Sequence, residues 1–114
     1  MEEVVRRILD GEVEIEVDDI DALRRELERI GVTIYLVKYE EAYKNPFLCT
    51  IASLLDEHMA KCAVEFARAR GASLHLIRAP SGPYLLLIPL QFFPRPPLRI
   101  HKRCTLLRTR WIRT

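Results

Sequence analysis

Residues 72–92 read ASLHLIRAPSGPYLLLIPLQF, two apolar segments separated by Pro-Ser-Gly-Pro. Gly and Pro at 80–83 favour a tight turn, so we expect strands over 72–79 and 84–92 that pair as a hairpin. Pro89 has no backbone N–H, which predicts that the second strand lies at a sheet edge or bends there. The hairpin implies a sheet whose remaining strands must come from earlier in the chain.

The segment before the hairpin alternates between strand and helix periods. Residues 12–17 alternate Glu with Val or Ile, which predicts a half-buried strand. The Asp18-Asp19 pair caps a predicted helix that ends at Gly31, and a second strand is expected over 32–39. Apolar residues at helical spacing before Gly11 suggest a short leading helix.

One long helix is predicted over 46–70. Asn45 is a favourable N-cap, Pro46 suits the first helical position, and Gly71 suits the end. The helix has a broad apolar face and a second stripe of small groups that could admit another helix, from this domain or from a partner. The candidate partner-binding residues are therefore Cys49, Ala60, Val64 and Ala67.

The predicted element order is β-α-β-α-β-β. We interpret it as an α/β fold of the two-layer α+β type, a mixed β-sheet with two helices on one face. A length of 114 residues suits one core, so residues 1–93 are expected to form a single domain. Residues 94–114 are expected to form a Pro-containing spacer followed by a basic C-terminal strand or arm.

Charge is sorted along the chain. Residues 1–41 carry 13 Asp/Glu and 6 Lys/Arg, whereas residues 94–114 carry seven Lys/Arg and no carboxylate, within a total of +2. The basic end could meet phosphates, or it could neutralise the acidic front of the same or a second copy. The apolar run 84–93 is about half the length that a bilayer requires, so we expect no membrane partner and a cytoplasmic location.

Three cysteines, Cys49, Cys62 and Cys104, form neither a CxxC pair nor an even-numbered framework. One Asn, one Gln and an excess of Arg over Lys favour a thermophilic source. Because intracellular disulfides persist in hyperthermophiles, a bridge to Cys104 or between chains remains open.

No enzyme motif stands out. All four glycines have expected roles at turns and helix ends, so none remains for a phosphate-binding loop. The serines lack a nucleophile elbow, and Asp56-Glu57-His58 fan apart on a helix and are expected to form a solvated stretch. We therefore expect no cofactor and favour a non-catalytic protein over an enzyme with a scattered site.

A zinc site is also disfavoured. His58, Cys62, His101 and Cys104 supply four ligands in number. On a strand, however, residues three apart point to opposite faces, so His101 and Cys104 would not converge on one ion. No metal is expected.

The strongest functional signal is the basic arm. Arginine pairs with phosphate oxygens, and a neighbouring aromatic ring can stack on an unpaired base. The candidate nucleic-acid-binding residues are Arg95, Arg99, His101, Lys102, Arg103, Arg108, Arg110, Trp111 and Arg113.

Residues 45–82 also resemble a known family. Asn45-Pro46-Phe47-Leu48, the helix after it, and the strand Leu74-His75-Leu76-Ile77-Arg78 ending in Ala79-Pro80-Ser81-Gly82 look like the tRNA-binding accessory subunit of the KEOPS (EKC) complex. The sequence differs in that Pro83-Tyr84 leads directly into an apolar strand. The resemblance implies a non-catalytic protein that binds a kinase-like subunit and tRNA and supports threonylcarbamoyl modification of tRNA.

Two functional hypotheses follow. The first is a non-catalytic nucleic-acid-binding accessory protein, acting in tRNA modification, that uses the basic arm. The second is a structural or interaction protein that forms a homodimer through its C-terminal arm and helix surface.

Overall fold

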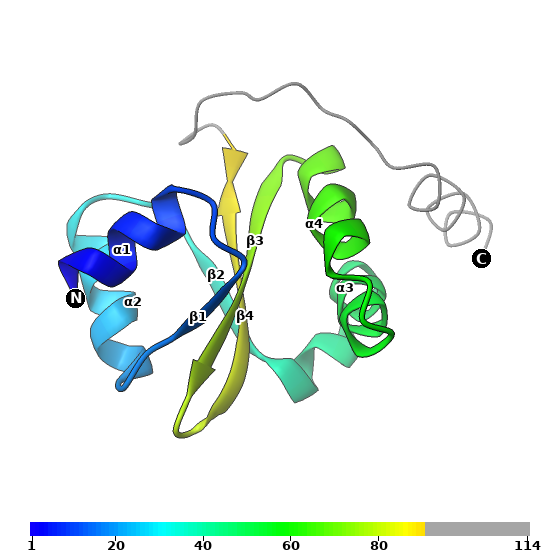
Figure 1. Ribbon diagram of the computed structural model, residues 1–114, viewed down its shortest axis with the longest axis horizontal. Coiled ribbons are helices and arrows are strands. Elements are labelled where there is room, and N and C mark those ends of the chain that lie inside the picture. Colours follow the sequence, from blue (N-terminus) through cyan, green and yellow to red (C-terminus); the bar gives the residue numbers. More distant parts are fainter. Residues whose placement is uncertain (91–114) are drawn as a thin grey trace.

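The predicted hairpin forms the centre of the sheet in the computed structural model, which describes residues 1–90 (Figure 1). The sheet has the strand order β1-β3-β4-β2. Its strands are β1 (Glu14–Glu16), β2 (Tyr35–Lys38), β3 (Ala72–Ala79) and β4 (Gly82–Pro89). β1 is parallel to β3, whereas β4 is antiparallel to β3 and to β2. The predicted mixed sheet is confirmed. β1, β2 and β3 run in the same direction, so their C-terminal ends lie at the same end of the sheet.

Helices cover both faces of this sheet. The helical elements are α1 (Glu2–Leu9), α2 (Ile20–Arg29), the 3₁₀ helix η1 (Tyr39–Lys44), α3 (Pro46–Asp56) and α4 (Ala60–Ala69). Figure 1 shows α1 and α2 on one side of the sheet and α3 and α4 on the other. The α+β class is confirmed, but the prediction of two helices on one face is wrong.

The reason lies in the hairpin strands. Leu74 and Leu76 pack in a core with α3 and α4, whereas Ile77 and Leu86 pack in a second core with α1 and α2. Both faces of β3 and β4 are therefore apolar, and a strand buried on both faces requires a helical layer on each side.

Pro89 does not mark an edge strand. β4 lies between β3 and β2, so of the two predicted alternatives, an edge strand or a bend, the edge strand is wrong. Pro89 is the last residue of β4, and pairing with β2 ends at Leu87. The Leu90 N–H donates to the Gly71 carbonyl and therefore points toward β3. Because successive residues alternate in direction, the Pro89 nitrogen points to the other side, where β2 has already ended, and its missing N–H leaves no hydrogen bond unmade.

Two predicted helix starts are confirmed in detail. The Asp19 side chain accepts hydrogen bonds from the Asp21 and Ala22 amides, and the Asn45 side chain accepts from the amides of Phe47 and Leu48. These N-caps satisfy amide groups that have no partner within the helix.

The long helix predicted over 46–70 is wrong, because the chain turns at residues 57–59 between α3 and α4. The stripe of four small residues is therefore divided. Cys49 is a free, partly buried thiol on α3, and Ala67 on α4 is fully buried in the core. Val64 packs against that core, while Ala60 is exposed at the start of α4. Cys104 lies outside the described residues.

No helix among residues 1–90 is long and apolar enough to cross a membrane.

A buried histidine links β3 to the start of β1. His75 is fully buried, and its Nδ1 lies 2.5 Å from the Glu12 carbonyl oxygen, which can only accept. Nδ1 therefore carries the proton, and Nε2, 2.9 Å from Ser73 Oγ, accepts from the hydroxyl. Burial lowers the pKa of His75, although the bond to Glu12 opposes that shift. The imidazole is thus neutral in the folded protein at neutral pH.

This arrangement predicts a loss of stability in mild acid. The unfolded chain takes up a proton at His75 as the pH falls below the ordinary imidazole value of 6.5, while the folded chain resists protonation, so unfolding becomes more favourable. We expect the urea midpoint to fall between pH 7.5 and pH 5.5, and this fall to be smaller in His75→Gln. His58→Gln, the same substitution at an exposed histidine, is the matched control. An unchanged fall in His75→Gln would contradict the assignment.

Candidate functional site

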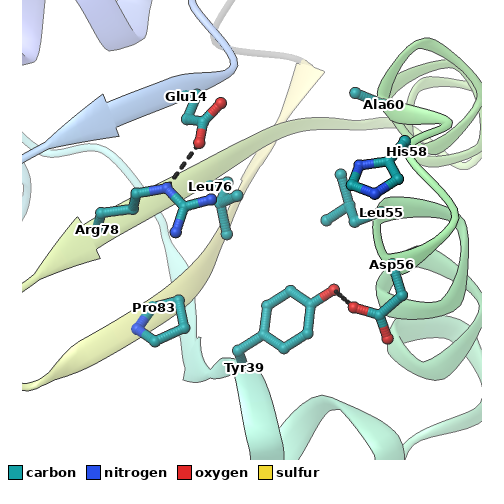
Figure 2. Close-up of a pocket in the computed structure, with 9 residues that line it drawn as sticks. All are labelled: Glu14, Tyr39, Leu55, Asp56, His58, Ala60, Leu76, Arg78 and Pro83. Atoms are coloured by element: carbon teal, nitrogen blue, oxygen red, sulfur yellow. Dashed lines mark hydrogen bonds and ion pairs between the residues drawn. The ribbon is translucent and has the colours of Figure 1, made fainter.

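A cleft of about 480 Å³ opens on the α3–α4 face of the sheet (Figure 2). It lies toward the C-terminal ends of β2 and β3, where open α/β sheets commonly bind ligands. α3 and α4 pack over β3 and β4 and leave the adjacent face of β1 exposed. The described residues that line the cleft are Glu14, Tyr39, Leu55, Asp56, His58, Ala60, Leu76, Arg78 and Pro83.

Two tyrosines hold Asp56 in place at the end of α3. The Tyr39 hydroxyl lies 2.7 Å from Asp56 Oδ1 and 2.8 Å from the Ala52 carbonyl oxygen. The Tyr43 hydroxyl hydrogen-bonds to the other carboxylate oxygen. η1 carries both tyrosines, and their rings meet edge to face at 6.3 Å between centroids. The carboxylate and both rings therefore have fixed positions.

These bonds fix the protonation states of the cluster. Hydrogen bonds from Tyr43 and Tyr39 lower the pKa of Asp56 below its ordinary value of 3.8. Burial raises the pKa of Tyr39, and the bond to Asp56 raises it further. At neutral pH the carboxylate is ionised and the Tyr39 phenol is protonated, so neither serves as an acid or base there. The cluster is therefore suited to a structural role, in which its hydrogen bonds keep one wall of the cleft in place.

The opposite wall is an ion pair on the sheet. Arg78 Nε lies 2.6 Å from Glu14 Oε1, and both side chains are more than half exposed, at 53% and 58%. Glu14 and Arg78 come from neighbouring strands, on the face left open beside α3 and α4. An exposed pair of this kind contributes little to stability. Its effect is to hold the guanidinium plane at the edge of the cleft.

His58 enters the cleft from the turn between α3 and α4. Its amide bonds to the Leu55 carbonyl at 3.0 Å, and the Met59 amide bonds to the Leu54 carbonyl at 2.9 Å. This pair of bonds is a Schellman motif, whose left-handed residue is usually glycine. His58 has φ 60°, whereas glycines with positive φ follow each of the other α-helices of residues 1–90. Among these helices, only α3 is followed by a left-handed residue that carries a side chain, and the His58 side chain lines the cleft.

The residues of this site are not among those predicted from the sequence. Asp56 and His58 are exposed, as expected for a solvated stretch, but the end of α3 brings them opposite Arg78. Tyr39, Glu14 and Arg78 lie far apart in the chain, and no local motif joins them. The one available signal was a histidine in place of a helix-ending glycine, which becomes visible only once the end of α3 is known.

The residues predicted from sequence are placed differently. The candidate nucleic-acid-binding residues, from Arg95 to Arg113, lie outside the described residues. Of the candidate partner-binding residues, only Ala60 lines the cleft. Within residues 1–90, no three His, Cys, Asp or Glu side chains gather in a way that could hold a metal ion.

Comparisons with protein-family models, with curated proteins and with solved structures find no match for this chain.

The left-handed backbone at His58 predicts that glycine stabilises the fold. A non-glycine residue in this conformation costs about 1 kcal/mol or more, and His58→Gly removes that cost. We expect unfolding in urea to require about 1 kcal/mol more free energy in this variant. Gly31→His makes the reverse change after α2, where a Cβ would meet nothing within 4 Å, and should destabilise by a similar amount. A less stable His58→Gly would mean that the side chain itself supports the fold.

The tyrosine cluster makes a second prediction. Tyr43 gives the largest contribution to the low pKa of Asp56, so Tyr43→Phe should raise that pKa toward 3.8. The bond from Tyr39 remains in this variant, so the shift should be incomplete. Carboxyl-detected NMR titration measures it directly. Tyr35→Phe, an exposed tyrosine on β2, is the control and should leave the Asp56 titration unchanged.

Proposed function

We propose that the protein is a non-catalytic nucleic-acid-binding accessory protein that contacts phosphates through the basic residues of segment 94–114. tRNA is the nucleic acid that the sequence resemblance favours, and a kinase-like subunit is the second partner that it implies. The observation that carries this proposal is the division of charge between residues 1–90, here called the body, and that segment.

The body is acidic. Residues 1–90 contain all 16 carboxylates and 11 of the 18 Lys and Arg residues, a net charge of −5. Five of these cations, Arg7, Arg24, Arg29, Lys44 and Arg78, already form ion pairs with carboxylates of the body. Segment 94–114 supplies the remaining seven cations and Trp111, with no carboxylate. Phosphate attraction is therefore expected to come from the segment.

The cleft also favours binding over catalysis. Asp56 and Tyr39 are held in protonation states that do not exchange near neutral pH, and Arg78 is engaged by Glu14. Among the described lining residues, only His58 is of the side-chain type that commonly moves protons at neutral pH. A general acid or base without a second proton-transfer partner gives weak support for an enzyme.

The same division of charge supports a second candidate. A segment of charge +7 is complementary to a body of charge −5, so it could join two copies into a homodimer by pairing with the body of its neighbour. In that case the segment's cations would be neutralised by protein carboxylates.

Charge removal in the segment tests the proposal. We expect the triple variant Arg108→Gln, Arg110→Gln, Arg113→Gln to bind tRNA more weakly and to reduce the log-log salt slope by about 2 to 3. The control removes three charges from the body with Arg7→Gln, Arg24→Gln and Arg29→Gln and should keep the wild-type slope. Filter binding at several salt concentrations gives both values.

A segment variant that binds tRNA with wild-type affinity and salt slope would overturn the proposal. If the segment variant instead shifts sedimentation from dimer to monomer without an effect on tRNA, the homodimer candidate is favoured.

A further inference from the structure

The cleft on the α3–α4 face has the construction of a small-molecule site. Its volume of about 480 Å³ lies within the range of roughly 300–1,000 Å³ that ligand pockets occupy. Apolar groups of Leu55, Leu76 and Pro83 line it between two polar walls. Figure 2 shows Arg78 on the sheet side, and His58 and Asp56 on the helical side.

Arg78 presents an oriented pair of donors. Its Nε is engaged by Glu14, while its two terminal nitrogens have no hydrogen-bond partner among residues 1–90. A guanidinium held in one plane recognises two adjacent acceptor atoms better than a single one. The wall therefore favours a ligand edge with two neighbouring acceptors.

The charge of the lining argues against a free anion. Glu14 and Asp56 outnumber Arg78, and no lysine is among the described lining residues. A phosphate or carboxylate would be bound beside two carboxylates with one guanidinium to offset them. A neutral ligand whose edge carries partial negative charge avoids this repulsion.

Tyr39 gives the cleft a rigid aromatic wall. Its single hydroxyl proton is shared between two acceptors, the Ala52 carbonyl oxygen and Asp56, and its ring packs edge to face against Tyr43. A preorganised aromatic ring beside apolar side chains favours a flat ligand, because stacking then requires little further ordering. His58 adds a second polar, planar group on the same side.

We propose that this cleft binds a neutral, planar heterocycle of the nucleobase type, with the guanidinium of Arg78 on two adjacent acceptors such as O6 and N7 of a 6-oxopurine and the base between apolar groups and Tyr39. The described residues that form this site all lie within residues 1–90. Variants at these positions therefore test the cleft separately from variants in segment 94–114. The base can come from a free nucleoside or from an unpaired residue of RNA, since both offer the same edge.

The test is an NMR titration of the full-length, ¹⁵N-labelled protein. We expect inosine to shift the signals of Arg78, Tyr39 and His58. Adenosine, in which an amino donor replaces O6, and 7-deazainosine, which lacks N7, should bind about tenfold more weakly or less. Inosine 5′-monophosphate should bind no more tightly than inosine. A single-stranded oligonucleotide with one inosine, compared with the same strand carrying adenosine at that position, identifies the source. A strand that binds more tightly than both inosine and its adenosine counterpart indicates RNA, and a strand that binds no better than its adenosine counterpart indicates a free nucleoside.

Two test variants and one control separate recognition from folding. Arg78→Lys keeps the charge but loses the paired donors, and should weaken inosine binding about tenfold. Arg24→Lys makes the same change in an exposed ion pair with Asp21 on α2 and should bind as wild type. His58→Gly should also weaken binding while the fold becomes more stable, a combination that a purely structural role of His58 would not produce.

Three results would overturn the proposal. One is the absence of shifts at Arg78 with inosine and with the oligonucleotide up to their solubility limits. Another is wild-type inosine affinity in Arg78→Lys. The third is tighter binding of the monophosphate, or of inorganic phosphate, at the same residues, which would make the cleft an anion site.

Discussion

Burial of the β3–β4 hairpin on both faces is the constraint on which the rest of the structure depends. Ile77, Leu85, Leu86 and Ile88 are fully buried, and each such side chain contributes about 1.5–3 kcal/mol when it leaves water. Neighbouring residues along each strand point to opposite faces, so a single helical layer would leave half of this apolar surface in water. The short segments before the hairpin therefore divide between the two faces, with α1 and α2 on one and α3 and α4 on the other.

The cleft is a consequence of this arrangement. α3 and α4 cover the two central strands, and the sheet extends beyond them to β1, whose glutamates face outward. The chain must also turn between α3 and α4 so that both can pack on the hairpin. His58 in that turn lines the cleft beside the uncovered face, and η1 brings Tyr39 to the cleft and Tyr43 to Asp56. The polar residues meet where the helical layer ends.

The division of charge acquires a physical meaning from the fold. Most carboxylates of the body lie on exposed helix and strand faces, and several hold nearby arginines in ion pairs. Segment 94–114 contains seven Lys and Arg residues and no carboxylate. Opposite charges are therefore concentrated in separate parts of one sequence.

The sequence by itself determined the features that depend on neighbouring residues. The strand of alternating glutamates, the caps at Asp19 and Asn45, and the presence of a tight turn between the hairpin strands were predictable, because backbone hydrogen bonds and side-chain period are local properties. The turn itself is shorter than predicted, because β4 already begins at Gly82. Only the tertiary structure decided the remainder. The break at His58 follows from the need to fold α4 back onto the sheet, and it overrides an apolar pattern that continues through it. The position of Pro89 inside the sheet depends on where β2 stops. The cleft joins Glu14, Tyr39, His58 and Arg78 across 64 residues of chain, and such a meeting is set by strand order and helix packing, which no local pattern records.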